Sequence, residues 1–169
     1  PIIFVANHQS LYDIVGIIWF MRKFHPKFVS KKELGKGIPS ISYNLTHGGS
    51  VLIDRTDPKQ AIPIINQLGH YIEEFTRSAV IFPEGTRSKT GKPKEFAQTG
   101  LKILCKSAPS AFVVPITINN SWKFVKYGFF PFGLGNRLIF TVHSAMAVKD
   151  FTFEALMEQT EQQIVQSIK

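Results

Sequence analysis

The fold is decided at the start of the chain, in the stretch Ile2-Ile3-Phe4-Val5-Ala6-Asn7-His8-Gln9-Ser10-Leu11-Tyr12-Asp13. Its first five residues are continuously apolar, which is typical of a strand buried in a sheet. An apolar, helix-like segment then runs from Leu11 to Met21. His8 therefore lies where a strand ends and a helix begins. A loop in that position fixes the backbone and leaves the histidine ring open to a ligand.

The carboxylate of Asp13 follows five residues after His8. In one continuous helix, five steps of about 100° would place the two side chains roughly 140° apart. They can meet only if His8 stands in the loop and Asp13 lies in the first helical turn. Ser10 and Asp13 have the spacing of a helix-start capping box, which favours that arrangement. Asp13 would then bond one ring nitrogen and leave the other as a base. The alternative is a capping carboxylate beside an ordinary loop histidine, and these residues leave both interpretations open.

Length and composition indicate one folded domain with an anionic partner. The chain has 169 residues, 44% of them hydrophobic and 19% charged, which excludes a disordered or fibrous protein. The formal charge of +8 favours nucleic acid, a phosphorylated metabolite or an anionic lipid surface as partner. Cys105 is the one cysteine, so a disulfide framework and a cysteine-based metal site are excluded. We expect a buried thiol there.

Strand-like and helix-like segments alternate along the chain. Strands are predicted at 2–6, 28–30, 50–53, 79–82, 112–118 and 138–142, and helices at 11–21, 57–75, 99–106 and 153–168. Continuous apolar strands with helices between them predict an α/β fold with a largely parallel sheet covered by helices on both faces. The sequence has no internal repeat and no interdomain linker, so we expect a single domain over residues 1–169.

In such a sheet, ligands bind outside the carboxyl ends of the strands. Three polar clusters follow predicted strands, and we expect them to share one site: Asn7-His8, Asp54-Arg55 and Glu84-Gly85-Thr86-Arg87. For Asp54-Arg55 taken alone, a surface ion pair is the simpler interpretation.

The run Pro83-Glu84-Gly85-Thr86-Arg87 has the chemistry of a phosphate site. Pro83 and Gly85 bracket a tight turn, so backbone N–H groups can approach a ligand closely. Thr86 adds a hydroxyl, and Arg87 adds a planar fork that holds phosphate by two hydrogen bonds. We interpret Glu84 as the acceptor that orients an arginine, and Arg87 with Arg55 as a clamp on a phosphate monoester.

Four motifs occur in a fixed order along the chain: His8 with Asp13, Gly49 to Arg55, Phe82 to Ser88, and Val114-Pro115-Ile116. Together they resemble the motifs of the glycerolipid acyltransferases, specifically the 1-acyl-glycerol-3-phosphate acyltransferases, over about residues 1 to 145. The resemblance implies a glycerol-3-phosphate acyltransferase-like fold. It implies acyl transfer from an acyl-CoA or acyl-carrier-protein thioester to the sn-2 hydroxyl of lysophosphatidic acid. The product is phosphatidic acid, in phospholipid biosynthesis. No metal and no cofactor beyond the thioester co-substrate is implied.

The resemblance also implies roles for single residues, and it favours a catalytic His8 oriented by Asp13. In the family's Lys-x-x-Leu segment the first lysine corresponds to Lys31, which would stabilise the oxyanion, with Lys32 the next candidate. The alternative is a solvated lysine pair. The acceptor phosphate would be bound by Arg55, Glu84, Gly85, Thr86 and Arg87.

The chain departs from the family pattern after the third motif. Many relatives have Phe-Lys-Lys-Gly where this chain has Phe96-Ala97-Gln98-Thr99-Gly100, which leaves the acceptor headgroup and the acyl carrier open. Val114-Pro115-Ile116 would contact the acyl chain by analogy, or would simply fill a strand core.

Family members work on a membrane, which here implies the cytoplasmic face, anchored by a segment that we expect upstream of residue 1. No apolar run approaches the ~20 residues of a membrane-spanning helix. Aromatic and basic residues mix at 19–23 and 122–132, which suits an anionic bilayer surface, or alternatively core aromatics with lysines reaching outward. Single-stranded nucleic acid would suit the same mixture but would leave His8 and the Glu84–Arg87 turn without a purpose.

Two other functions remain open at this point. One is the same chemistry on glycerol-3-phosphate or another lysolipid. The other is a non-catalytic, basic lipid-binding module with the same fold.

Overall fold

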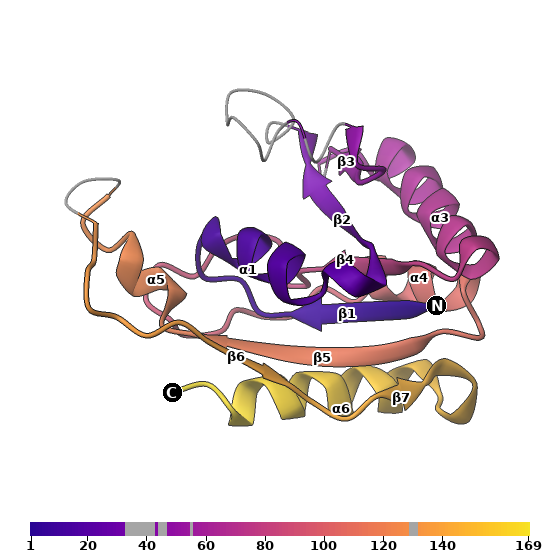
Figure 1. The fold of residues 1–169 in the computed structure, drawn as a ribbon. Helices are drawn as coiled ribbons and strands as arrows, with labels where there is room; N and C mark the ends of the chain where they lie inside the picture. Colours follow the sequence, from indigo (N-terminus) through magenta and orange to yellow (C-terminus); the bar gives the residue numbers. More distant parts are fainter. Residues whose placement is uncertain (33–42, 44–46, 55, 129–131) are drawn as a thin grey trace.

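The computed structural model describes residues 1–32, 43, 47–54, 56–128 and 132–169. The strands are β1 (Ile2–Ala6), β2 (Pro26–Lys31), β3 (Val51–Ile53), β4 (Ser78–Ile81), β5 (Phe112–Asn119), β6 (Ile139–Val142) and β7 (Met146–Ala147). The helices are α1 (Tyr12–Phe20), α3 (Pro58–Phe75), α4 (Thr99–Ser107), α5 (Ser121–Phe124) and α6 (Phe153–Gln166), with single 3-10 turns η1 (Arg22–Phe24) and η3 (Val148–Asp150). Figure 1 shows their arrangement.

The strands form one sheet in the order β3-β2-β4-β1-β5-β6, and β7 pairs with β5 as well. The pairs β2–β3, β2–β4, β1–β4 and β1–β5 are parallel, whereas β6 and β7 run antiparallel to β5. The predicted α/β fold with a largely parallel sheet is therefore confirmed. Its first strand, β1, lies in the middle, between β4 and β5.

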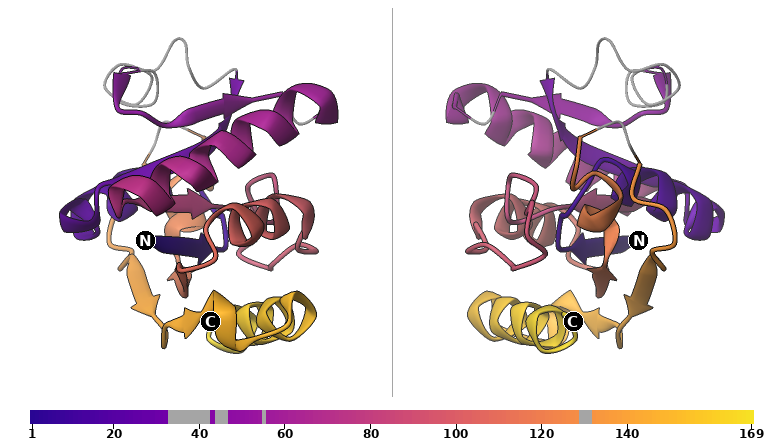
Figure 2. Two further views of the ribbon diagram at one scale, coloured as in Figure 1. Left: turned by 90° about the vertical axis from the view of Figure 1, so that its right-hand side faces the viewer. Right: turned by 90° about the vertical axis from the view of Figure 1, so that its left-hand side faces the viewer.

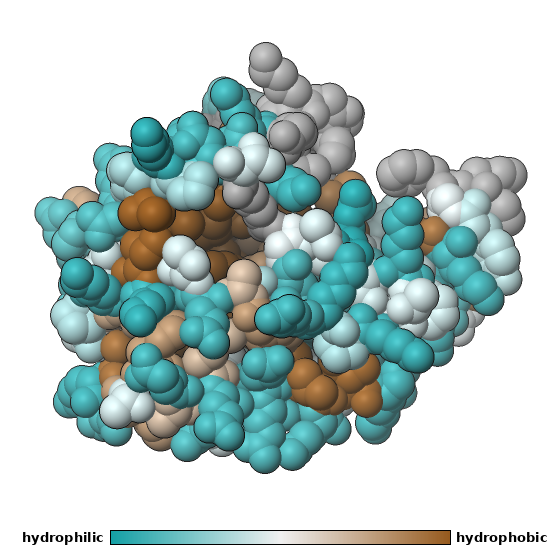
Figure 3. Space-filling view, turned by 180° about the vertical axis from the view of Figure 1, so that it is seen from behind, coloured by the Kyte–Doolittle hydropathy of each residue, from teal (hydrophilic) through white to brown (hydrophobic). Residues whose placement is uncertain are grey.

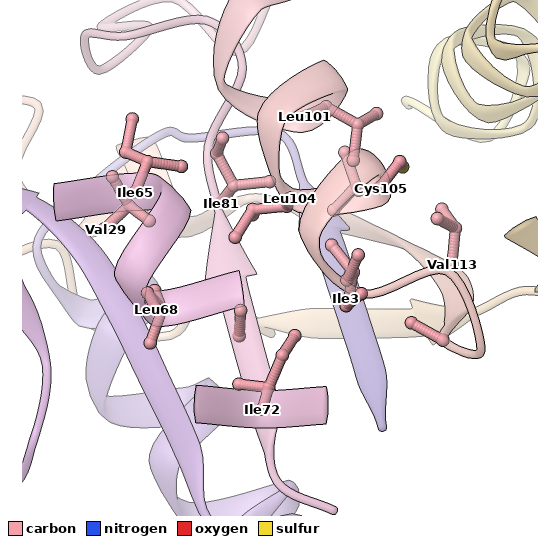
Figure 4. Packing of buried hydrophobic residues seen from close by; sticks show 14 of the residues in the cluster. Ile3, Val29, Ile65, Leu68, Ile72, Ile81, Leu101, Leu104, Cys105 and Val113 are labelled. Atoms are coloured by element: carbon pink, nitrogen blue, oxygen red, sulfur yellow. The ribbon is translucent and has the colours of Figure 1, made fainter. Parts of the chain in front are cut away.

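Helices cover both faces of the sheet, because alternate residues of each buried strand point to opposite sides. On one face Ile3, Val113 and Ile81 pack with residues of α3 and α4 (Figure 4). Residues of α6 belong to the same cluster. On the other face Phe4 and Ile116 pack against Ile14 and Ile17 of the short helix α1. Figure 2 shows α6 at the β5–β7 end of the molecule and α3 at the β2–β3 end.

The helix α3 begins and ends as the sequence predicts. The Asp57 side chain caps its start by accepting hydrogen bonds from the N–H groups of Lys59 (3.0 Å) and Gln60 (3.3 Å), with Pro58 in the first turn. The helix continues through Pro63 and ends at Thr76, which adopts a left-handed conformation with φ of 50°. Within the described ranges, no helix has both the length and the apolar character needed to cross a bilayer.

The parallel strands deliver their following loops to one rim of the sheet. Val5 of β1 pairs with Ile81 of β4 and with Pro115 of β5. The loop after β1 therefore emerges beside the loop after β4 on one side and near the end of β5 on the other. This register brings distant polar residues together around His8.

Candidate functional site

His8 and Asp13 form the pair that their spacing predicts. Nδ1 of His8 lies 2.9 Å from Oδ2 of Asp13, and Asp13 lies in the first turn of α1. The Asp13 side chain is fully buried and His8 is 8% exposed. The loop-then-helix geometry is therefore correct, and the ring can still be reached from outside.

Asp13 accepts hydrogen bonds from donors around its whole carboxylate. Oδ2 also accepts from the backbone N–H groups of Gln9 (2.6 Å) and Ser10 (2.9 Å), and Oδ1 accepts from the hydroxyl of Ser121. A carboxylate surrounded by donors is held as an acceptor. A hydrogen on Nδ1 of His8 fits this arrangement, because the other groups around the carboxylate donate to it, and that tautomer would leave the lone pair on Nε2.

The predicted capping box is present only in part, because α1 begins after Leu11 and has no side-chain cap at that position. Asp13 accepts from the N–H of Ser10, as the motif requires, but the Ser10 hydroxyl accepts from the N–H of Tyr12 (3.1 Å). The same hydroxyl lies 2.5 Å from that of Ser121. Ser10 therefore lies just before the helix and contacts the residue that bonds Asp13.

The loop after β4 holds the backbone and the ring of His8. The backbone N–H of His8 donates to Oε1 of Glu84 (2.8 Å), and the backbone carbonyl of His8 accepts from the N–H of Ser88 (2.7 Å). The ring stacks on Phe82, with centroids 4.2 Å apart and planes 20° from parallel. Residues between Phe82 and Ser88 therefore fix both the backbone and the ring of His8.

That run makes the tight turn that its sequence predicts. The N–H of Gly85 donates to the carbonyl of Phe82 (3.1 Å), and Gly85 has φ of 70°, which favours glycine. Beyond the turn, Thr86 accepts a 2.7 Å hydrogen bond from Nζ of Lys94. The turn thereby presents Thr86 and Arg87 to the pocket described below.

Glu84 has a role that the sequence did not predict. We interpreted it as the acceptor that orients an arginine, but among the described residues its carboxylate bonds backbone N–H groups, those of His8 (2.8 Å) and Lys94 (2.9 Å), rather than Arg87. Burial raises the pKa of the Glu84 carboxyl above its ordinary value, and these hydrogen bonds oppose the rise. The carboxylate joins two loops instead of facing a ligand.

A pocket of about 560 Å³ opens beside His8. Its apolar wall consists of Leu11 and Ile14 at the start of α1, Val29 of β2 and Phe82 directly after β4. Its cationic wall consists of Lys31 at the end of β2 and of Arg87, Lys89 and Lys94 in the loop after β4. The lining residues are His8, Leu11, Ile14, Val29, Ser30, Lys31, Phe82, Gly85, Thr86, Arg87, Lys89 and Lys94. Apolar and cationic side chains that line one pocket together with an imidazole suit a ligand with a hydrocarbon part and an anionic part.

A second pocket of about 280 Å³ borders the first at Val29, Phe82 and Gly85. Its lining is mostly apolar and comes from β3, the first half of α3, the end of β4 with the residues after it, and α4 with the segment before it. The residues are Ile53, Pro58, Ala61, Ile62, Ile65, Ile81, Pro83, Ala97, Thr99, Gly100 and Ile103. Figure 3 shows a hollow with hydrophobic walls on this side of the molecule. The two pockets share one wall beside the Glu84 turn.

Two of the remaining predicted residues, Asp54 and Lys32, line neither pocket. Asp54 does not line either pocket, and its carboxylate accepts from the N–H and hydroxyl of Thr56 (2.9 and 2.6 Å). Arg55 lies outside the described residues, so the clamp with Arg87 stays a prediction. Lys32 is exposed and lines neither pocket, unlike Lys31.

The fourth motif and the cysteine belong to the core. Val114, Pro115 and Ile116 are buried in β5 and line neither pocket, so the strand-core interpretation is the one that the structure fits. Cys105 is buried in α4, and burial raises the pKa of its thiol to about 12, which agrees with an inert cysteine.

Sequence reasoning missed Ser121 and Gln9. The amide of Gln9 accepts from the N–H of Ser121 (3.0 Å) and donates to the carbonyl of Gly91 (3.4 Å), so it links three loops. A signal was present in the run Asn119-Asn120-Ser121, a fourth polar cluster after a strand. Nothing in that run, however, predicts that the hydroxyl of Ser121 donates a hydrogen bond to Asp13.

The chain is similar to known acyltransferases. A family model described as Acyltransferase matches residues 1–119. The 1-acyl-sn-glycerol-3-phosphate acyltransferase of Helicobacter pylori is 37% identical over 125 residues, 69% of this chain and 50% of the relative. That of Saccharomyces cerevisiae is 30% identical over 177 aligned positions, all of this chain and 56% of the relative. The crystal structure of the 1-acyl-sn-glycerophosphate acyltransferase PlsC of Thermotoga maritima superposes with a TM-score of 0.76 at 26% identity, covering 99% of this chain and 65% of that one.

The chain thus spans about half the length of these two curated relatives. The family model covers 119 of the 169 residues and includes the His8–Asp13 pair, the Glu84–Arg87 turn and strand β5. The solved structure extends the likeness of the fold to nearly the whole chain. On this ground the chain belongs to the acyltransferase family.

Proposed function

We propose that this chain moves a fatty acyl group from a thioester, acyl-CoA or acyl-carrier protein, to the sn-2 hydroxyl of 1-acyl-glycerol-3-phosphate, giving phosphatidic acid. The observation that carries the proposal is the His8–Asp13 pair at a pocket with one apolar and one cationic wall. The names of the relatives support the acceptor, since each is a 1-acyl-sn-glycerol-3-phosphate acyltransferase.

His8 is the general base in this proposal. An alcohol attacks a thioester poorly, so its proton must leave as the carbon–oxygen bond forms. Asp13 holds the hydrogen on Nδ1, which leaves the lone pair of Nε2 for that proton. As the carbon–sulfur bond breaks, the proton on Nε2 passes to the departing thiolate. Bonds and protons then balance, and His8 returns to its starting form without an acyl-enzyme.

The tetrahedral intermediate needs donors for its oxyanion. Lys31 ends β2 and lines the same pocket as His8, so its ammonium is the candidate donor. The exposed Lys32, which does not line that pocket, is the weaker candidate.

The anionic end of the acceptor would lie on the cationic wall. Arg87 lines the pocket in the loop that also fixes His8, so a phosphate on Arg87 would set the distance of the acceptor hydroxyl from Nε2. Arg55 would complete the clamp. The hydrocarbon chains would lie along Leu11, Ile14 and Phe82 and extend into the second, apolar pocket.

We also propose that the domain works at an anionic membrane surface, on the cytoplasmic face. Trp19 and Phe20 at the end of α1 are 65% and 60% exposed, and the guanidinium of Arg22 lies 5.2 Å from the Trp19 ring centroid. Exposed aromatic rings beside a cation suit the headgroup region of a bilayer.

A panel of acceptors against both thioester donors tests the proposal. We expect thiol release with lysophosphatidic acid to exceed that with glycerol-3-phosphate and with lysophosphatidylcholine. A preference for one of the other acceptors would reassign the substrate within the same chemistry. Binding of lysophosphatidic acid without turnover under any donor would favour the non-catalytic lipid-binding module.

A further inference from the structure

The cationic wall of the larger pocket contains a lysine for which the proposed chemistry has no use. Lys31 and Arg87 have roles in acyl transfer, whereas Lys94 also lines the pocket, from the loop after the Glu84 turn. Its Nζ donates a 2.7 Å hydrogen bond to Oγ1 of Thr86, the residue next to Arg87. The ammonium is thus bonded to the residue that precedes Arg87, and both Lys94 and Arg87 line the same pocket.

The backbone of Lys94 is fixed relative to His8. Its N–H donates to Oε2 of Glu84 (2.9 Å), and the other oxygen of that carboxylate accepts from the N–H of His8 (2.8 Å). One buried carboxylate therefore sets the position of both residues. The N–H of Ala97, three residues after Lys94, also donates to the carbonyl of Pro83 (2.9 Å). The loop that contains Lys94 is therefore bonded to the Glu84 turn at this point as well.

The charge and the free donors of Lys94 match a phosphate monoester. Such a group carries a charge of about −1.5 to −2 at neutral pH, more than one guanidinium neutralises. An ammonium has three N–H donors, and among the described residues the bond to Thr86 uses one of them, which leaves two for a ligand. The hydroxyl hydrogen of Thr86 is also left to donate, because its oxygen is the acceptor in that bond.

We propose that Lys94 binds a substrate phosphate together with Arg87, and that the tie through Glu84 sets its distance from the base His8. The inference rests on the proposed acyl transfer, because it names a further residue for the same site. Either substrate could bring a phosphate: the acceptor as a monoester, or the donor in its phosphopantetheine carrier. The place of Lys94 beside Arg87 favours the acceptor.

Steady-state kinetics of Lys94→Met separate these sources, because this variant keeps the side-chain stem and the backbone N–H that bonds Glu84. We expect the KM for lysophosphatidic acid to rise about tenfold, with kcat and the donor KM near the parent values. Lys94→Arg should restore most of the affinity, since it keeps the charge. A rise confined to the donor KM would also support a phosphate ligand and assign it to the carrier.

The matched control is Lys92→Met, an exposed lysine of the same loop that does not line the pocket. It should leave both KM values at the parent level. If Lys94→Met also leaves both unchanged, or if Lys92→Met raises them equally, the inference is wrong.

A binding measurement keeps the inference apart from the proposed function. Lysophosphatidic acid and monoacylglycerol, which lacks the phosphate, are titrated separately into the parent protein and Lys94→Met in detergent micelles. We expect the variant to lose affinity for the first ligand and not for the second. Failure of turnover in the parent would overturn the acyltransferase proposal, whereas equal loss of both ligands, or of neither, would overturn the role of Lys94.

Discussion

At the scale of single residues, the buried carboxylate of Asp13 depends on donors that come from two loops. Gln9 and Ser10 precede it in the chain, but Ser121 reaches it from beyond the end of β5. Because β5 lies next to β1 in the sheet, this hydroxyl connects the His8–Asp13 pair to a neighbouring strand. The orientation of the imidazole therefore depends on a residue that has no place in the local sequence motif.

Ser121→Ala should lower turnover without weakening substrate binding. The substitution removes the hydroxyl donor to Asp13, and one hydrogen bond to a charged group contributes about 1.5–3 kcal/mol. We expect kcat to fall at least about tenfold, with the acceptor KM little changed. Initial rates at varied acceptor concentration provide the measurement.

The matched control is Ser107→Ala, a buried serine of α4 that lines neither pocket and whose hydroxyl donates to the Asn66 side chain and to the carbonyl of Ile103. It should lower stability and leave kcat alone. Equal kcat in the parent and Ser121→Ala would show that Ser121 does not position the pair.

Glu84 should make stability fall as the pH rises through the weakly acidic range. Its pKa is raised by burial in the folded state, so between the ordinary glutamate value and the raised value the folded protein binds a proton that the unfolded chain has lost. The free energy of unfolding then decreases with rising pH in that window. Glu84→Gln lacks the titrating group, so the parent should lose stability relative to this variant as the pH rises. Urea unfolding of both proteins at several pH values between 4 and 7 measures the difference, and a difference that grows in favour of the parent would contradict it.

At the scale of elements, helices α3 and α4 approach each other closely at Gly69. A Cβ added there would lie 2.4 Å from Cβ of Ser107, on the facing helix. At Gly16 of α1, by contrast, an added Cβ would meet the end of the Phe140 ring, which is half-buried and can move aside. Both glycines are helical, so alanine gains similar helix propensity at the two positions.

Gly69→Ala should therefore destabilise the protein more than Gly16→Ala does. Separating α3 from α4 costs about 1–3 kcal/mol, of which helix propensity returns up to about 1 kcal/mol. The midpoints of urea unfolding for the two variants and the parent give the comparison. A Gly69→Ala variant as stable as the parent would mean that the helices separate without cost.

Element by element, the sequence predicts most of the fold. Continuous apolar runs correctly predict β1, β4 and β5, and the Asp57-Pro58 pair correctly predicts the start of α3. The two-residue strand β7 and the four-residue helix α5 were missed, because elements so short leave no periodic pattern.

The site was predictable where its chemistry lies in one segment and not where it depends on register. His8 with Asp13 and the turn at Gly85 are local patterns, and both were found. The pairing of Glu84 with the His8 backbone, and of Ser121 with Asp13, depends on β1 lying between β4 and β5. The spacing of residues along the sequence does not predict which strands are neighbours in the sheet.

At the scale of the whole molecule, the exposed aromatic end of α1 should bind anionic bilayers. Trp19 and Phe20 are exposed on a protein whose formal charge is +8. Burial of the rings in the bilayer and attraction to acidic lipids would therefore both contribute to the binding free energy. We expect co-sedimentation with vesicles containing phosphatidylserine and little with phosphatidylcholine alone.

The double variant Trp19→Ser/Phe20→Ser should weaken this binding several-fold. Replacement of Phe75, an exposed aromatic at the end of α3, by serine is the control and should not weaken it. Undiminished binding of the double variant would place the membrane contact elsewhere on the protein.

The central claim is that the imidazole of His8 takes the proton of the acceptor hydroxyl. The most direct measurement is kcat for acyl transfer to lysophosphatidic acid in His8→Ala, in protein whose unfolding midpoint and affinity for the acceptor are checked first. The account predicts that kcat falls by about 10²–10⁴-fold while acceptor binding is retained. A folded His8→Ala protein that turns over within a few-fold of the parent rate would contradict it.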